Sequence, residues 1–125
     1  MAHLLVVDDE SSIRLLYEQE LAEEGHRVTT AATAGEAVEK LENEKFDLVV
    51  LDIKLKNESG LDLLQKIVKE RHEMPVILCT AFSFYKDDFS AWLADGYVVK
   101  SSNLSELKEE IKRVLARKNP VKSEG

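Results

Sequence analysis

Two short apolar runs of this sequence end directly on carboxylates. Leu4–Val7 is followed by Asp8 and Asp9. Leu48–Leu51, which like the first run has the length and composition of a buried strand, is followed by Asp52. If the two strands are parallel neighbours, three acids meet at one edge of a sheet, where two carboxylates about 4 Å apart repel each other by roughly 4 kcal/mol. Such a cluster indicates a bound cation, an unusual protonation state, or both.

Runs of this kind alternate with amphipathic stretches along the chain. The stretches between them repeat apolar residues at helical spacing, and two open with a capping box, Thr33-x-x-Glu36 and Asn103-x-x-Glu106. Five strands alternating with five helices predict an α/β fold with a doubly wound, flavodoxin-like parallel sheet of order 2-1-3-4-5. The expected strands are His3–Val7, Arg27–Ala31, Asp47–Leu51, Val76–Cys79 and Tyr97–Val99.

The topology predicts where a binding site forms. In a doubly wound sheet, sites lie outside the carboxyl ends of the strands where the winding direction reverses, here beside the strands that end on aspartates. Two further strand ends add the hydroxyl of Thr80 and the ammonium of Lys100. Hard oxygen ligands suit Mg²⁺, and lysine and hydroxyl donors suit an anion. Because these strand ends carry no histidine base, activated serine or thiolate, the natural nucleophile is a carboxylate and the natural electrophile is phosphorus.

Charge and composition narrow the set of partners. The 125 residues predict a single domain, and the formal net charge of -7, with scattered Lys and Arg, argues against nucleic-acid binding. No apolar run is long enough to span a membrane, and the single cysteine, Cys79, excludes an intrachain disulfide. We therefore expect a cytoplasmic monomer with no nucleic-acid or membrane partner.

Five elements of the sequence occur in a characteristic order and spacing. They are Asp8-Asp9, Asp52, Gly60, Thr80-Ala81 and Tyr97-x-x-Lys100. Together they resemble the receiver domain of bacterial two-component response regulators, and the resemblance covers nearly the whole chain. Within this family, the chain resembles the single-domain receivers of chemotaxis and of sporulation phosphorelays. We therefore expect a stand-alone receiver domain over residues 1–118 and a flexible C-terminal tail over 119–125.

The resemblance implies a role for each position of the site. Asp52 would accept a phosphoryl group from a histidine of a sensor histidine kinase or a histidine phosphotransferase. Mg²⁺ would be bound by Asp9, Asp52 and the backbone carbonyl of Lys54, with Asp8 acting mainly through water. Lys100 would pair with the phosphoryl oxygens. Such a protein is a signalling phospho-acceptor that assists its own phosphorylation and dephosphorylation, and is not otherwise an enzyme.

A switch pair is implied as well. The hydroxyl of Thr80 would bind the phosphoryl group, and Tyr97 would turn inward into the space that Thr80 vacates. The surface of the fourth helix, fifth strand and fifth helix would then change its affinity for a downstream protein effector. The plainer interpretation of Tyr97 is a core aromatic that the last strand needs for packing.

Most aromatic residues lie between residues 82 and 97. One interpretation is a core in which a short fourth helix buries Tyr85, Phe89 and Trp92. The other is a partly exposed patch that binds a partner.

The sequence departs from the family pattern at two prolines. Ser101 follows Lys100 where receivers usually carry proline after a cis bond, and Lys56 stands where they often carry a second proline. A cis bond before a residue other than proline costs about 2.5–4 kcal/mol. We therefore expect a trans bond and a rearranged loop after Lys100.

Two other function classes stay open at the level of sequence. Ser101 is compatible with a degenerate receiver that acts as a phosphate-independent adaptor. The acids are also compatible with a small Mg²⁺-dependent phosphohydrolase that uses an aspartate nucleophile, although Asp8-Asp9-Glu10 matches that pattern only loosely. A flavodoxin fits less well, because the loop after the first strand is acidic where a phosphate cradle is required.

The positions that commonly tune the lifetime of the phosphoryl group are Lys54 and Phe82. A bulky Phe82 would screen the phosphoryl group from an attacking water, so we expect slow self-dephosphorylation. Phosphorylation with a small donor, followed by timing of the decay, measures this lifetime. A decay as rapid as that of chemotaxis receivers would contradict the expectation.

Overall fold

The computed structural model describes residues 2–56, 58–71, 73–81, 92–101 and 103–118. Its centre is a five-stranded sheet of order β2-β1-β3-β6-β7 in which all neighbours are parallel. Counted along the sheet-forming strands this is the order 2-1-3-4-5, so the predicted topology is confirmed. The strands are β1 (His3–Val7), β2 (Arg27–Ala31), β3 (Leu48–Leu51), β6 (Val76–Thr80) and β7 (Gly96–Val99).

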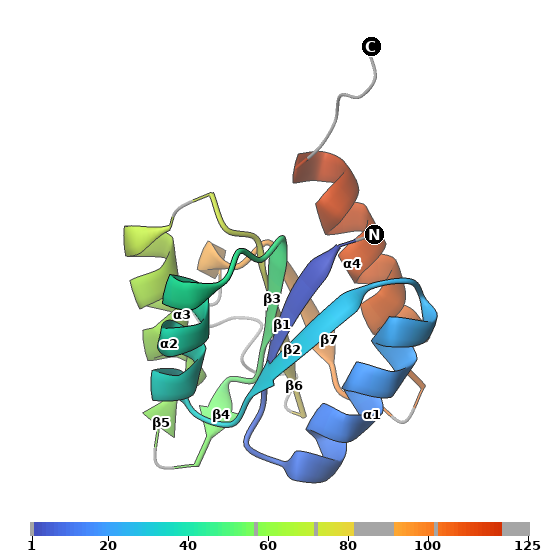
Figure 1. Cartoon of the computed structure of the whole chain (residues 1–125), viewed down its shortest axis with the longest axis horizontal. Helices are drawn as coiled ribbons and strands as arrows, with labels where there is room; N and C mark the ends of the chain where they lie inside the picture. The colour runs from blue at the N-terminus through green and yellow to red at the C-terminus, as the bar shows by residue number, and fades with distance from the viewer. Residues whose placement is uncertain (1, 57, 72, 82–91, 102, 119–125) are drawn as a thin grey trace.

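Helices cover both faces of this sheet, as Figure 1 shows. One face packs against α1 (Ser11–Glu23) and α4 (Ser105–Lys118), and the other against α2 (Ala34–Asn43) and α3 (Gly60–Glu70). Successive residues of each central strand alternate between the two cores. Leu4 and Val6 lie on the α1–α4 side, and Leu5 on the α2–α3 side. Because both faces are buried, the central strands are apolar apart from the terminal residues His3 and Thr80, instead of alternating with polar residues.

The ends of the elements follow the expected signals. Gly25 ends α1 with a φ of 95°, a conformation that favours glycine. The hydroxyl of Thr33 accepts from the N–H of Glu36 at 3.1 Å, as the capping box predicts. The Glu36 carboxylate accepts from the N–H of Ala32 at 2.6 Å, one residue earlier than in the usual box. At α4, the side-chain oxygen of Asn103 accepts from the Ser105 N–H at 2.8 Å, so it too caps the first turn.

Of the two interpretations of the aromatic residues, core burial is wrong for Trp92. Its side chain is 69% exposed, and the neighbouring Leu93 is 46% exposed. The residue of this turn that packs against the core is Ala94. Four helices occur among the described residues, and the rest of the helix expected to bury Tyr85 and Phe89 falls outside them. No helix in the described ranges is both long and apolar enough to cross a membrane.

A two-stranded hairpin follows β3 and was not predicted. It consists of β4 (Lys54–Leu55) and β5 (Glu58–Ser59), which pair antiparallel. Gly60 begins α3 directly after this hairpin, and its N–H donates to the carbonyl of Ile53 at 2.6 Å. A Cβ atom at Gly60 would lie only 1.9 Å from the carbonyl oxygen of Asp52. Only glycine therefore fits at position 60, where α3 begins against the backbone of Asp52 and Ile53.

We predict that Gly60→Ala lowers the free energy of unfolding by about 2–3 kcal/mol or more, because the added methyl group meets backbone atoms that cannot turn away. Gly35→Ala is the matched control, since a Cβ atom there meets only the Thr33 hydroxyl oxygen at 3.9 Å. Inside α2 this second change should be neutral or stabilising by up to about 1 kcal/mol. Urea denaturation of both variants measures the difference, and equal stabilities would contradict it.

Candidate functional site

The register of the parallel strands places the acids side by side. Val7 of β1 pairs with Leu51 of β3, so Asp8 and Asp52 emerge next to each other at the carboxyl edge of the sheet. Backbone hydrogen bonds continue the ladder beyond the strands, from the Asp52 N–H to the carbonyl of Val7 at 3.0 Å. Asp8 is only 2% exposed and Asp52 only 6% exposed, whereas Asp9 is half-buried.

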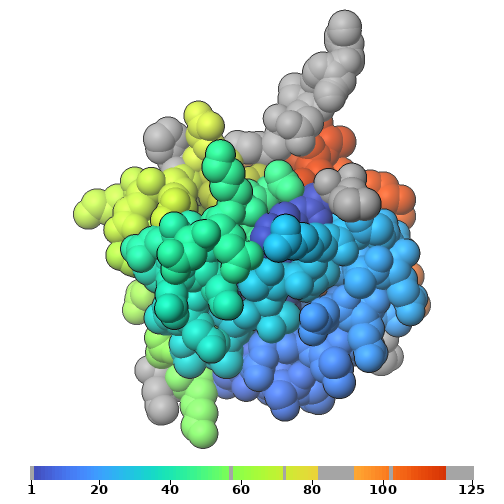
Figure 2. Space-filling model, viewed as in Figure 1, coloured from blue at the N-terminus to red at the C-terminus, as the bar shows by residue number. Residues whose placement is uncertain are grey.

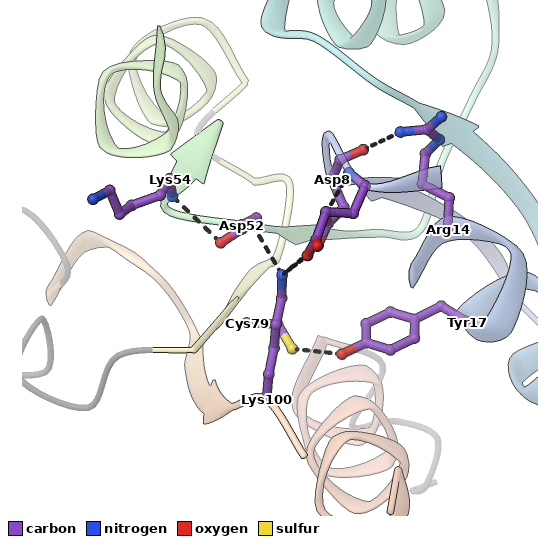
Figure 3. Close-up of polar contacts among 8 residues, drawn as sticks. Asp8, Arg14, Tyr17, Asp52, Lys54, Cys79 and Lys100 are labelled. Atoms are coloured by element: carbon purple, nitrogen blue, oxygen red, sulfur yellow. Dashed lines mark hydrogen bonds and ion pairs between the residues drawn. The ribbon is translucent and has the colours of Figure 1, made fainter. Parts of the chain in front are cut away.

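Lys100 reaches this acidic edge from the end of β7. Its backbone N–H donates to the carbonyl of Thr80 at 2.7 Å. Its ammonium nitrogen lies 2.7 Å from Oδ2 of Asp8 and 3.0 Å from Oδ2 of Asp52, with Oε1 of Glu10 at 3.9 Å (Figure 3). One ammonium group therefore bridges two buried carboxylates.

The bond from Lys100 to Ser101 is trans, as expected, since no peptide bond in the described ranges is cis. The hydroxyl of Ser101 accepts from the N–H of Asn103 at 3.0 Å and donates to the carbonyl oxygen of Asn103 at 2.9 Å. The Ser101 side chain thus contacts Asn103 at the position where receivers usually carry proline, and Lys100 still contacts both acids.

Each buried aspartate directs its other oxygen at a backbone amide. Oδ1 of Asp8 accepts from the Glu10 N–H at 2.9 Å, and Oδ1 of Asp52 accepts from the Lys54 N–H at 3.3 Å. The guanidinium of Arg14 donates to the carbonyl oxygen of Asp8 at 2.6 Å. The sequence reasoning missed Glu10 and Arg14 as part of this site. Their closeness to Asp8, two and six positions after it in the sequence, was the available signal.

The protonation equilibria reflect these contacts. Burial raises the pKa of Asp52, and the nearby Asp8 adds to this, although Lys100 acts in the opposite direction. Burial lowers the pKa of Lys100, but its hydrogen bonds to Asp8 and Asp52 outweigh burial, so that its pKa is raised overall. The pKa of Lys100 rises because its ammonium group contacts two carboxylates. The pKa of Asp52 rises because contact with one ammonium group does not offset the carboxylate's loss of hydration. Lys100 is therefore firmly charged, and the site keeps an excess of negative charge.

Thr80 and Tyr97 lie on the same face of the sheet. Tyr97 pairs with Leu78, which is two residues before Thr80 on β6 and belongs to the α2–α3 core. Thr80 is fully buried, and Tyr97 is half-buried with its ring packed against that core. Of the two positions predicted to tune the lifetime, Lys54 has an exposed side chain, and Phe82 lies outside the described residues. The roles assigned to these residues stay predictions.

Cys79 lies beneath the site and is not a nucleophile. Its sulfur is 3.4 Å from the hydroxyl oxygen of the buried Tyr17 (Figure 3). Burial raises the pKa of the Cys79 thiol to about 11. The pKa of the Tyr17 hydroxyl is raised as well, first by burial and then by Cys79. Both groups stay neutral near pH 7, so the charged chemistry of the site belongs to the carboxylates and Lys100.

The donor set fits a divalent cation. One carboxylate oxygen from each of Asp8, Asp9 and Asp52 lies within 4.8 Å of the other two. Opposite ligands of an octahedral Mg²⁺ ion are about 4.2 Å apart and adjacent ligands about 3 Å apart. These hard oxygen atoms would therefore move inward when they bind Mg²⁺ directly.

Comparisons with known proteins agree with this geometry. The family model of the response regulator receiver domain matches residues 4–112. The crystal structure of the response regulator TrrA from Thermotoga maritima, in complex with Mg²⁺ and BeF, is 46% identical with a TM-score of 0.88, and the match covers 91% of this chain and 99% of that one. TrrA has also been solved in complex with the histidine kinase ThkA, and that match is 47% identical with a TM-score of 0.87, over 92% of this chain and 99% of TrrA.

A curated relative is the alkaline phosphatase synthesis transcriptional regulatory protein PhoP of Bacillus subtilis, 34% identical over 91% of this chain and 48% of PhoP. The chain spans about half the length of the curated relatives it matches. The sheet order, the acidic edge and the family match over 4–112 agree with one another. This chain belongs to the receiver domain family of two-component response regulators.

Proposed function

We propose that this receiver accepts a phosphoryl group on Asp52, with Mg²⁺, from a histidine of a sensor histidine kinase or a histidine phosphotransferase. The observation that carries the proposal is the pair of contacts at the Asp52 carboxylate. One oxygen lies 3.0 Å from the ammonium of Lys100, and the other accepts from the Lys54 N–H at 3.3 Å. Asp8 is held by a similar pair of contacts, so the choice of Asp52 as the acceptor rests in addition on its position directly after β3, where the receiver family carries the phosphoacceptor.

Two properties of the Thermotoga protein support this proposal. TrrA is solved with Mg²⁺ and BeF, and in a separate structure with a histidine kinase. Because this chain matches nearly the whole of TrrA at 46–47% identity, a kinase partner and a Mg²⁺ cofactor are the most economical expectation here.

The proposed transfer is a substitution at phosphorus. An oxygen of the Asp52 carboxylate forms the new bond while the bond from phosphorus to the imidazole nitrogen of the donor breaks, and the electron pair of that bond stays on the imidazole. Bound Mg²⁺ would neutralise charge on the transferring group. Asp9, Asp52 and the Lys54 carbonyl would hold the ion, with Asp8 acting through water. Lys100, whose charge is secured by two carboxylates, would pair with phosphoryl oxygens together with the hydroxyl of Thr80.

The two alternative functions are not favoured. A phosphate-independent adaptor was considered because Ser101 replaces proline, yet Lys100 contacts both Asp8 and Asp52 with this serine in place. A separate phosphohydrolase is not favoured, because residues 4–112 of this chain match the family model of a signalling domain.

The output would be a protein surface. Thr80 and Tyr97 lie on one face of the sheet, so movement of the Thr80 hydroxyl toward a phosphoryl group would change the space around Tyr97. We propose that a downstream protein effector binds the surface that includes β7 and α4. We further propose a cytoplasmic, monomeric receiver over residues 1–118, and with a net charge of -7 it should bind no nucleic acid.

The first test is phosphorylation itself. Incubation with a small phosphoryl donor and Mg²⁺ should add one phosphoryl group per chain, detected by mass spectrometry of the intact protein. Asp52→Asn and chelation of Mg²⁺ should each abolish the addition. Asp62→Asn, which changes an exposed aspartate on α3, is the matched control and should be phosphorylated like the wild type. Phosphorylation of the Asp52→Asn variant would refute the proposal.

The second test concerns the charge balance of the site. Asp52→Asn removes a buried charge that burial and Asp8 disfavour, while Lys100 keeps Asp8 at 2.7 Å, so we expect the free energy of unfolding without Mg²⁺ to rise. Saturating Mg²⁺ should also stabilise the wild type, because it binds the folded state. Thermal and urea denaturation measure both effects.

The matched variant Lys100→Met should change stability in the opposite direction. It removes the ammonium group and leaves Asp8 and Asp52 buried without their cation, at a cost of about 2 kcal/mol or more. Destabilisation by Asp52→Asn, or stabilisation by Lys100→Met, would contradict this account of the charges.

A further inference from the structure

The β4–β5 hairpin controls where the backbone lies beside Asp52. Lys54 is the first residue of the hairpin, and its N–H donates to Oδ1 of Asp52 at 3.3 Å. Lys54 pairs with Ser59 across the hairpin, and Leu55 pairs with Glu58. Leu55 is only 5% exposed and belongs to the α2–α3 core. A movement of the hairpin would therefore move the Lys54 peptide relative to the Asp52 carboxylate.

The hairpin is attached to α3 at its base. The Gly60 N–H donates to the carbonyl of Ile53 at 2.6 Å, and the hydroxyl of Ser59 accepts from the Leu61 N–H at 3.2 Å. These contacts join the hairpin to the helix that follows it in the sequence.

A second attachment joins the hairpin to α2. Oε2 of Glu58 accepts from the N–H of Ala34 at 3.2 Å, although the two residues are 24 positions apart. Ala34 is the first residue of α2. Figure 1 shows β4 and β5 at the end of α2 where that helix begins, and in Figure 2 the hairpin atoms (green) lie next to those of α2 (teal).

The chemistry of this contact is favourable for a carboxylate. The first amides of a helix have no partner within the helix, and the helix dipole places partial positive charge there. Thr33 satisfies the N–H of Glu36, and Glu58 satisfies that of Ala34. Glu58 therefore supplies both a hydrogen-bond acceptor and a negative charge where α2 needs them.

We propose that Glu58 is a positioning residue for the Asp52 site. By fastening the hairpin to the start of α2, its carboxylate fixes the Lys54 peptide beside Asp52, so that the Lys54 carbonyl and the acids form one cation site. The proposal rests on the proposed function of Asp52. Coupling of this kind is reciprocal: if the Glu58 contact strengthens Mg²⁺ binding, bound Mg²⁺ strengthens the Glu58 contact by the same factor.

Three variants of the full chain separate the possibilities. Glu58→Ala removes the acceptor and the charge, whereas Glu58→Gln keeps an acceptor and loses the charge. Glu39→Gln removes the same charge from an exposed position of α2, and in the described part of the chain no polar contact joins that side chain to the hairpin. It is the matched control.

The Mg²⁺ dissociation constant is measured by NMR titration of the Lys54 amide. We expect Glu58→Ala to raise it about fivefold, at the low end of the range for coupled sites. Glu58→Gln should lie between this variant and the wild type, and Glu39→Gln should match the wild type. Hydrogen exchange at the Ala34 amide is the reciprocal readout. Mg²⁺ should slow this exchange in the wild type and leave it unchanged in Glu58→Ala.

The outcomes distinguish this proposal from the proposed function. If Glu58→Ala lowers stability but binds Mg²⁺ as tightly as Glu39→Gln does, Glu58 is merely a structural cap and the inference is overturned. If Mg²⁺ affinity follows the expected order but the wild type takes up no phosphoryl group, the positioning role holds and the proposed function fails.

Discussion

The ammonium group of Lys100 is the interaction on which the acidic edge of the sheet depends. Its nitrogen lies 2.7 Å from Asp8 and 3.0 Å from Asp52, and both carboxylates are almost completely buried. A buried charge without a partner is strongly destabilising, so two such acids could not stay ionised at one edge unaided. One lysine contacts both, and together with Asp9 the three carboxylates still exceed it by two negative charges. The fold thus tolerates a site whose remaining negative charge a divalent cation can neutralise.

The parallel register makes this arrangement a consequence of topology. β1, β3, β6 and β7 all end at the same edge, and each is followed there by a functional group or, for β6, ends on one. A slip of one residue in any pair would turn a group toward the opposite core. Gly60 adds a second constraint, because α3 can begin against the Asp52 carbonyl only without a side chain. Strand register and the backbone at Gly60 therefore determine where the site residues lie.

Sequence patterns predicted the sheet and the cluster because both depend on strand ends, which apolar runs reveal. The hairpin after Asp52 escaped prediction, since strands of two residues carry no periodic signal. The contact between Glu58 and Ala34 joins positions far apart in the sequence and has no local signature. The sequence left the burial of Trp92 open, because an aromatic residue in a short turn has the same local sequence pattern whether it is buried or exposed. The contact of Lys100 with both acids was also hard to predict, because it depends on the backbone after Lys100, where Ser101 replaces the usual proline.

The burial of Cys79 has a practical consequence. Its side chain is 2% exposed, and its thiol stays protonated near neutral pH. The thiolate of an accessible cysteine is the nucleophile that attacks a thiol reagent, so Cys79 can be modified only when the sheet opens. Cys79 immediately precedes Thr80 on a central strand, where opening approaches complete unfolding. The rate at which a thiol reagent modifies Cys79 therefore reports how often the sheet opens globally. A ligand that binds the neighbouring site should lower this rate, and the measurement needs no engineered cysteine.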